Sequence, residues 1–113
     1  MTAVLLTVLL GPVLAYALTA TPGDILANPD RYDRQTVTIS GSVTNLRETV
    51  SRRGNPYYTF DLSDGKQAIR VFSFGKAPCQ SGTATVDGVF EKVKRVGHLT
   101  FPNEITANRV TCR

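Results

Sequence analysis

Charged side chains are absent from the first 23 residues of this 113-residue chain, since every Lys, Arg, Asp and Glu lies at Asp24 or later. The net charge of +4 therefore belongs to the remainder. Tryptophan is also absent, histidine occurs once and cysteine twice. A chain of this length has room for one domain. These features exclude a multidomain enzyme and a polytopic membrane protein, and leave a small binding module open.

Residues that commonly carry catalysis or bind metals are scarce. There is no Cys-x-x-Cys pair, which argues against thioredoxin-like redox chemistry and c-type haem attachment. Two distant cysteines and one histidine do not have the spacing of a zinc site. No glycine-rich phosphate loop precedes a helix. A Ser-His-Asp or Cys-His arrangement would depend on His98 alone. We therefore predict a protein that is not an enzyme and has no cofactor.

The uncharged N-terminal segment has the features of an export signal. An apolar run fills residues 4–14, and Ala15-Tyr16-Ala17 follows as a small-x-small pattern. This combination predicts a signal peptide over residues 1–17, with a second cut site after Ala20. The run is shorter than the roughly 20 residues of a membrane span. No Lys or Arg precedes it, so either the amino terminus supplies the positive charge or the true start lies upstream. A buried helix and an uncleaved anchor are the alternatives.

Export has consequences for the rest of the chain. Removal of 17 residues leaves a mature chain of 96 without a predicted membrane span, expected in the periplasm or secreted. In an oxidising compartment, an even number of cysteines predicts a disulfide, here between Cys79 and Cys112.

Residues 18–35 have the pattern of a lead-in with a short helix. Thr21 is a predicted N-cap, Pro22 suits the first helical position and Asp24 suits the first turn. The helix should end at Asn28-Pro29, because the residue before a proline is disfavoured in the α region. Ile25 is expected to pack inward.

From residue 36 onward the pattern alternates with period two and is rich in β-branched residues. Asp64-Gly65 is a hairpin turn signal, Gly41 marks a bend or bulge, and Pro102 should split the last strand or lie at an edge. We predict strands over residues 36–45, 57–62, 67–74, 83–93 and from 98 or 99 to 111. Loops are expected over residues 47–56 and 75–82. Five short strands with glycine at their bends predict a small all-β barrel.

Several motifs resemble a known group of domains. They are Gly41-Ser42-Val43-Thr44-Asn45, the segment from Tyr58 to Asp64, and Ala68-Ile69-Arg70-Val71-Phe72. The chain resembles OB-fold domains of the anticodon-binding type, such as the N-terminal domain of the exodeoxyribonuclease VII large subunit. Residues 27–33 also look like the lead-in of small exported bacterial OB-fold proteins.

This resemblance implies a five-stranded Greek-key barrel over residues 36–113. Residues 75–82 are too few for a helix between strands three and four, so the N-terminal helix is the candidate to close the barrel end. Strands three and five run side by side in this fold, and their C-terminal ends would bring Cys79 and Cys112 together.

OB-folds bind ligands on strands two and three and on the loops joining strands one-two and four-five. Those two regions hold 6 of the 13 basic residues. If Tyr58, Phe60 and Leu62 point inward, their neighbours point outward, and Phe72 then faces out beside Arg70. The alternative is that the aromatic side chains belong to the core. The predicted ligand-binding residues are Tyr57, Thr59, Arg70 and Phe72, flanked by Arg52, Arg53, Lys94 and Arg95.

These residues favour an exported, non-enzymatic binding module. Aromatic faces between cations suit single-stranded nucleic acid, and the same charge would suit another anionic oligomer such as a polysaccharide. One alternative is a cell-envelope module that binds a protein through the same barrel. A further alternative is a haem- or metal-handling protein that uses His98.

Overall fold

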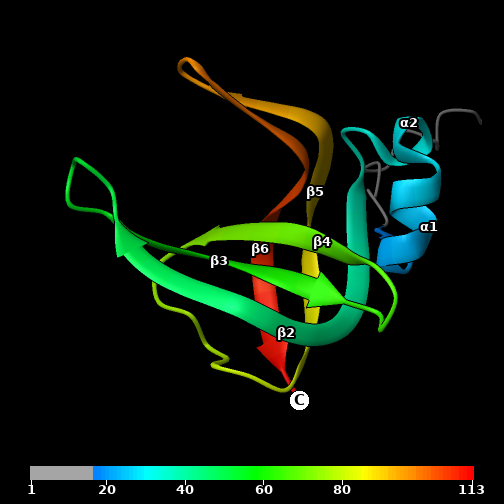
Figure 1. The fold of residues 1–113 in the computed structure, drawn as a ribbon, viewed down its shortest axis with the longest axis horizontal. Helices are drawn as coiled ribbons and strands as arrows, with labels where there is room; N and C mark the ends of the chain where they lie inside the picture. Colours follow the sequence, from blue (N-terminus) through cyan, green and yellow to red (C-terminus); the bar gives the residue numbers. More distant parts are fainter. Residues whose placement is uncertain (1–16) are drawn as a thin grey trace, which may run out of the picture.

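Residues 17–113 are described by the structure, a computed structural model (Figure 1). The helices and strands, in chain order, are β1 (Leu18–Thr19), α1 (Pro22–Ala27), α2 (Pro29–Tyr32), β2 (Thr36–Val50), β3 (Pro56–Ser63), β4 (Ala68–Phe74), β5 (Thr83–Val96) and β6 (Leu99–Cys112). The predicted signal peptide lies outside the described residues except for Ala17. None of the helices within residues 17–113 has the length and apolarity needed to cross a membrane.

The sheet closes into a ring of five strands. Its order is β2-β3-β4-β6-β5, and β5 pairs back onto β2. The pairing of β4 with β6 is parallel and the other pairings in the ring are antiparallel. Strand β1 adds to β2 in parallel. The prediction of a five-stranded barrel is confirmed.

One face of each strand fills the barrel interior, because alternate residues of a strand point to opposite faces. Phe60 and Leu62 from β3 are buried, and Ile69 and Val71 from β4 lie beside them. The prediction of which side chains of β3 and β4 point into the barrel is therefore correct. The core also contains Val37, Ile39, Val86, Phe90 and Ile105.

Two short helices lead into the barrel where one was predicted. In α1, Thr21 Oγ1 accepts a hydrogen bond from the amide of Asp24 at 3.0 Å, and Asp24 Oδ2 accepts one from the amide of Thr21 at 3.0 Å. The helix ends at Asn28, as expected, but α2 starts again at Pro29. Ile25 and Tyr32 are buried in the core cluster. No helix separates β4 from β5, so these lead-in helices provide the helical packing against the barrel.

Gly41 lies next to Ser42, where β2 passes from its pairing with β5 to its pairing with β3, and Figure 1 shows that β2 is strongly curved; the bulge, the other predicted possibility, lies further along the strand. The irregularity in β2 lies between Thr44 and Arg47, where Asn45 has a φ of 53°. A Cβ atom at Gly41 would collide with the carbonyl oxygen of Ser63. Gly41 therefore allows two backbones to approach closely, and the bulge falls at Asn45, a residue type that tolerates positive φ.

Strands β2 and β5 are longer than predicted, whereas β6 has nearly the predicted bounds. β2 continues to Val50, so Arg47 lies in a strand and the loop to β3 is limited to residues 51–55. β5 and β6 continue past the barrel as a two-stranded arm, which turns at Gly97 and His98. Figure 1 shows this arm rising away from the ring. β6 is continuous through Pro102, which is tolerated because β4 pairs with β6 only at residues 104–106 and the arm has a free edge there.

The predicted disulfide is present between Cys79 and Cys112, whose Cα atoms lie 5.6 Å apart. Cys79 follows β4, and Cys112 ends β6. The parallel pairing of these two strands brings the cysteines together, as the resemblance implied. The bond ties the loop before β5 to the C-terminal end of the chain.

Candidate ligand-binding groove

The outer face of β3 and β4 carries the four central residues of the predicted site. Thr59 pairs with Phe72 across the two strands, and Tyr57 pairs with Phe74. Because paired residues share a face, these side chains form one surface. Arg70 precedes Phe72 by two positions in β4, so its side chain points to the same side of the sheet. The structure thus brings Tyr57, Thr59, Arg70 and Phe72 together.

Aromatic rings run in a continuous line along this face. The ring centroids of Tyr57 and Phe72 are 5.2 Å apart and the rings are tilted by 32°. Phe72 meets Phe74 edge to face, with centroids 5.0 Å apart. Phe74 is 70% exposed, so the end of this aromatic line is accessible from the solvent. Such rings offer flat apolar surfaces on which planar groups stack.

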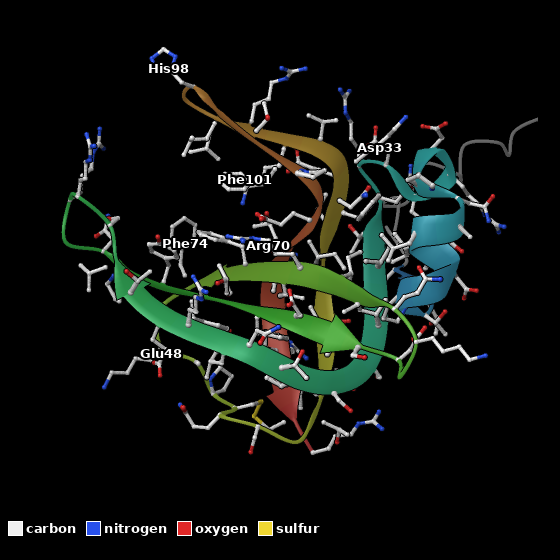
Figure 2. All side chains as sticks on the ribbon, viewed as in Figure 1. Asp33, Glu48, Arg70, Phe74, His98 and Phe101 are labelled. Carbon is white, nitrogen blue, oxygen red and sulfur yellow. A yellow bond between two sulfur atoms is a disulfide. The ribbon has the colours of Figure 1, made fainter. Side chains whose placement is uncertain are left out.

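The β5–β6 arm forms the second wall of the groove. Lys94, Val96, Leu99 and Phe101 from the arm face Phe72 and Phe74 across a groove of about 450 Å³. In Figure 2, Phe101 on the arm lies above Phe74 and Arg70, which are side by side on the sheet. The groove therefore depends on the part of β5 and β6 that extends beyond the barrel.

Two cations lie against aromatic rings in this groove. The Nζ atom of Lys94 is 4.0 Å from the centroid of Phe72, and the Cζ atom of Arg70 is 5.2 Å from that of Phe101. Both distances are within the range of cation–π interactions. Aromatic and cationic groups are thus interleaved at the floor of the groove.

Glu104 lies beneath these cations and was not predicted as a site residue. Its Oε1 accepts a hydrogen bond from Lys94 Nζ at 2.7 Å, and its Oε2 lies 2.6 Å from Arg70 Nε. The second contact has the distance of an ion pair but lacks hydrogen-bond geometry, which leaves Oε2 without a hydrogen bond. The carboxylate is 1% exposed. It neutralises one of the two positive charges at the floor.

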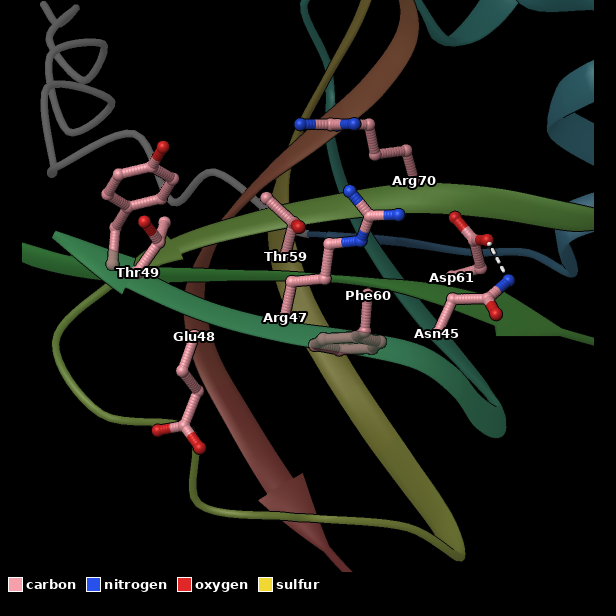
Figure 3. Close-up of a pocket in the computed structure, with 9 residues that line it drawn as sticks. Asn45, Arg47, Glu48, Thr49, Thr59, Phe60, Asp61 and Arg70 are labelled. Carbon is pink, nitrogen blue, oxygen red and sulfur yellow. Dashed lines mark hydrogen bonds between the residues drawn. The ribbon is translucent and has the colours of Figure 1, made fainter. Parts of the chain in front are cut away.

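A larger and more polar cavity of about 830 Å³ adjoins the groove and shares Tyr57 and Arg70 with it. Figure 3 shows Arg47 and Arg70 extending into the same space beside Thr59, whereas Glu48 points away. Asn45 Nδ2 donates a hydrogen bond to Asp61 Oδ2 at 2.8 Å at the edge of this cavity. Arg47, an exposed residue of β2, is a second site residue that the predicted set did not contain.

The four basic residues predicted to flank the groove lie in three different places relative to it. Arg52 and Arg53 are exposed in the loop between β2 and β3, next to Ser51, which lines the groove. Lys94 lies at the floor. Arg95 is on the opposite face of the arm, because alternation directs Lys94 and Val96 into the groove. The prediction that Arg95 flanks the groove is therefore not matched by its position.

Lys92, which the sequence places with Lys94 and Arg95 in one basic region, points away from the groove. Its Nζ donates a hydrogen bond to Asp30 Oδ1 of α2 at 2.7 Å, and this bond raises the pKa of Lys92. Its backbone amide donates to Asp33 Oδ1 at 2.8 Å. Lys92 thus links β5 to the lead-in helix.

His98 is exposed at the turn of the arm (Figure 2). Within residues 17–113, no three His, Cys, Asp or Glu side chains gather in the way that metal binding requires.

The sequence itself gives no family assignment, since no family model and no curated protein sequence matches it. Solved structures show that the fold is an OB-fold. The crystal structure of yeast Stn1 and Ten1 superposes with a TM-score of 0.65 at 14% identity, over 85% of this chain and 62% of that chain. The chain thus spans less than two thirds of that relative. The OB domain of Ta0387 from Thermoplasma acidophilum matches with a TM-score of 0.52 and 20% identity, over 86% of this chain and 88% of that one.

Proposed function

We propose that this protein is an exported, non-enzymatic OB-fold module that binds single-stranded nucleic acid. The observation that carries the proposal is the aromatic line of Tyr57, Phe72 and Phe74, facing Phe101 on the arm. Bases of any sequence stack on such rings. This surface lies on the strands and beside the arm that OB-folds use for oligonucleotides and oligosaccharides.

The exposed arginines would bind the phosphate backbone of the ligand. Arg47 lies at the polar cavity, and Arg52 and Arg53 lie in the loop at the end of the groove. Each phosphate that an arginine neutralises releases bound counterions, so affinity falls as salt rises. Another anionic oligomer, such as a polysaccharide, would meet the same charges.

Export is supported by the apolar segment and the small-x-small pattern at residues 15–17. A disulfide between Cys79 and Cys112 fits an oxidising compartment. The resemblance to small exported bacterial OB-fold proteins supports the same location. Fractionation of cells that produce the full chain tests it, and material retained in the cytoplasm with free thiols would contradict export.

Binding of fluorescent oligo(dT) by residues 18–113 at increasing salt tests the function. For single strands, the logarithm of the affinity should fall with the logarithm of salt by about 0.7 per phosphate contact. Replacing both loop arginines, Arg52→Ala with Arg53→Ala, should weaken binding and reduce that slope by up to about 1.4.

The matched control removes the same charge elsewhere, with Arg31→Ala in α2 and Arg95→Ala on the outer face of the arm. It should change the slope less than the loop variant does. A slope near zero that the loop variant leaves unchanged would refute nucleic-acid binding. Anionic glycans assayed in parallel identify the alternative oligomer.

A second candidate is a protein-interaction module of the cell envelope. It is favoured by the exposed apolar side chains Phe74, Val96 and Leu99 along the groove. Such a module would bind its partner with little dependence on salt, which distinguishes it from the first. The haem- or metal-handling alternative predicts an absorbance change on titration that is lost in His98→Ala.

A further inference from the structure

We propose that Glu104 determines the specificity of the groove: it keeps the phosphates of the ligand away from the floor and leaves the floor to the bases. The inference rests on the proposed function, because it concerns how the same groove selects its ligand.

Glu104 occupies the place that a phosphate would take between two cations. It alternates with Ile105, which points into the barrel core, so the carboxylate points to the outer face beneath the arm. Register places it directly beside Arg70, its partner across the parallel strands. Lys94 covers it from the arm and is itself only 13% exposed.

Burial makes these contacts hard to exchange. A buried carboxylate that loses its cations is strongly destabilised, because no water replaces them. Lys94, which is 13% exposed, therefore stays with Glu104, and Arg70, whose side chain is 43% exposed, already contacts the carboxylate through its Nε atom. Glu104 also lowers the charge of the floor from two positive charges to one, so a phosphate there is attracted less strongly than it would be without the carboxylate.

The remaining cations of this face are free of such a partner. Among residues 17–113, Arg47, Arg52 and Arg53 form no ion pair. All three are exposed and lie outside the floor. The phosphates of a bound strand would follow these arginines, and its bases would lie over Phe72 and Phe101.

The test is Glu104→Gln, which keeps the shape of the side chain and removes its charge. Two probes are used: oligo(dT), and inorganic polyphosphate, which has the charge without the bases. The variant should bind polyphosphate at least about tenfold more tightly than the wild type, since charge-assisted contacts of this kind are worth about that factor. Its salt slope should steepen by about 0.7 for each cation released, on the single-strand scale.

An affinity for polyphosphate that stays the same or falls in Glu104→Gln would overturn the inference, because Glu104 would then only position the two cations. A gain on polyphosphate while the wild type binds no oligonucleotide or other base-bearing strand would show that Glu104 keeps phosphate from the floor, and would refute the proposed function and the role given to the bases. The two failures are therefore distinguishable.

A second comparison decides the question if Glu104→Gln does not fold. Lys94→Met should change the affinity for oligo(dT) but not its salt slope, because Lys94 neutralises Glu104 and not a phosphate. Arg47→Met should reduce the slope by about 0.7. Arg95→Met, on the outer face of the arm, is the control for a lost distant charge. An equal reduction in Lys94→Met and Arg47→Met would overturn the inference.

Discussion

At the scale of single residues, the charge at the floor of the groove depends on one acidic side chain, that of Glu104. Arg70 and Lys94 are attractive candidates for phosphate binding when the sequence is considered alone. In the structure both contact Glu104, at 2.6 and 2.7 Å. The positive charge available to a ligand is therefore found at the rim of the groove more than at its floor.

Asp64 shows how one carboxylate connects a turn to a helix. Its Oδ1 accepts hydrogen bonds from the amides of Lys66 and Gln67, and its Oδ2 accepts one from the amide of Gly23 in α1. The bonds from Gln67 and Lys66, which are the largest causes, hold the pKa of Asp64 below its ordinary value. The sequence predicted the turn but not the contact with α1.

We expect Asp64→Ala to lower the Tm at neutral pH. A carboxyl group whose pKa is lower in the folded state stabilises that state above its unfolded pKa, and this contribution is lost as the pH falls through the folded value. The difference in Tm from the wild type should therefore shrink below about pH 3.8, the ordinary value for this group. Thermal denaturation followed by circular dichroism measures it.

The control is Lys66→Ala in the same turn, which keeps the backbone amide and should leave the Tm nearly unchanged. A Tm difference in Asp64→Ala that persists at pH 2 would contradict the electrostatic explanation.

At the scale of elements, β1 distinguishes the two cut sites of the predicted signal peptide. Leu18 and Thr19 pair with β2, the amide of Ala20 donates to the carbonyl of Thr38 at 3.1 Å, and Ala20 is buried. Cleavage after Ala17 retains all of these contacts, whereas cleavage after Ala20 removes β1.

We therefore expect exported material to begin at Leu18. Intact-mass spectrometry and N-terminal sequencing check this directly. A mature chain starting at Thr21, with a Tm equal to that of residues 18–113, would show that β1 contributes nothing and that the second site is used.

The disulfide between Cys79 and Cys112 also acts at the scale of elements, because it joins the loop before β5 to the end of β6. It joins residues 33 positions apart and closes a long loop that contains all of β5. On the chain-entropy account, closing such a loop stabilises the fold by roughly 3–4 kcal/mol.

Replacement by Cys79→Ala with Cys112→Ala should lower the free energy of unfolding by about that amount, measured by urea denaturation. Wild-type protein treated with a reductant should lose a similar amount, which separates the bond from the packing of the side chains. Equal stability of oxidised and reduced wild type would contradict the prediction.

At the scale of the whole molecule, the groove is formed by two parts of one closed sheet. The face of β3 and β4 supplies one wall and the arm of β5 and β6 supplies the other, and β4 pairs with β6 at the base of both. A ligand that contacts both walls binds only the folded ring, so it should stabilise the whole fold by mass action.

Oligo(dT) at about 100 times its Kd should raise the free energy of unfolding by about 2.7 kcal/mol. Thermal shift with and without the oligonucleotide measures this. Arg52→Ala with Arg53→Ala should show a smaller shift at the same concentration. An equal shift in the two proteins would mean that the loop arginines do not contribute to binding.

The amino-acid sequence by itself determined the parts that depend on neighbouring residues. Period-two alternation predicted which residues of β3 and β4 fill the core, Asp64-Gly65 predicted the turn, and Thr21 with Asp24 predicted the start of α1. These signals are local, because each arises from backbone geometry within a few residues. The resemblance added the strand order and, with it, the pairing of the cysteines.

Only the tertiary structure decided the parts that depend on register between distant strands. It placed Glu104 beside Arg70, turned Arg95 away from the groove and set the arm that carries Phe101 opposite the face of β3 and β4. A shift of one residue in any strand reverses which face a side chain occupies. The charge of the groove was therefore settled by the pairing of strands far apart in the chain, which composition and local pattern do not specify.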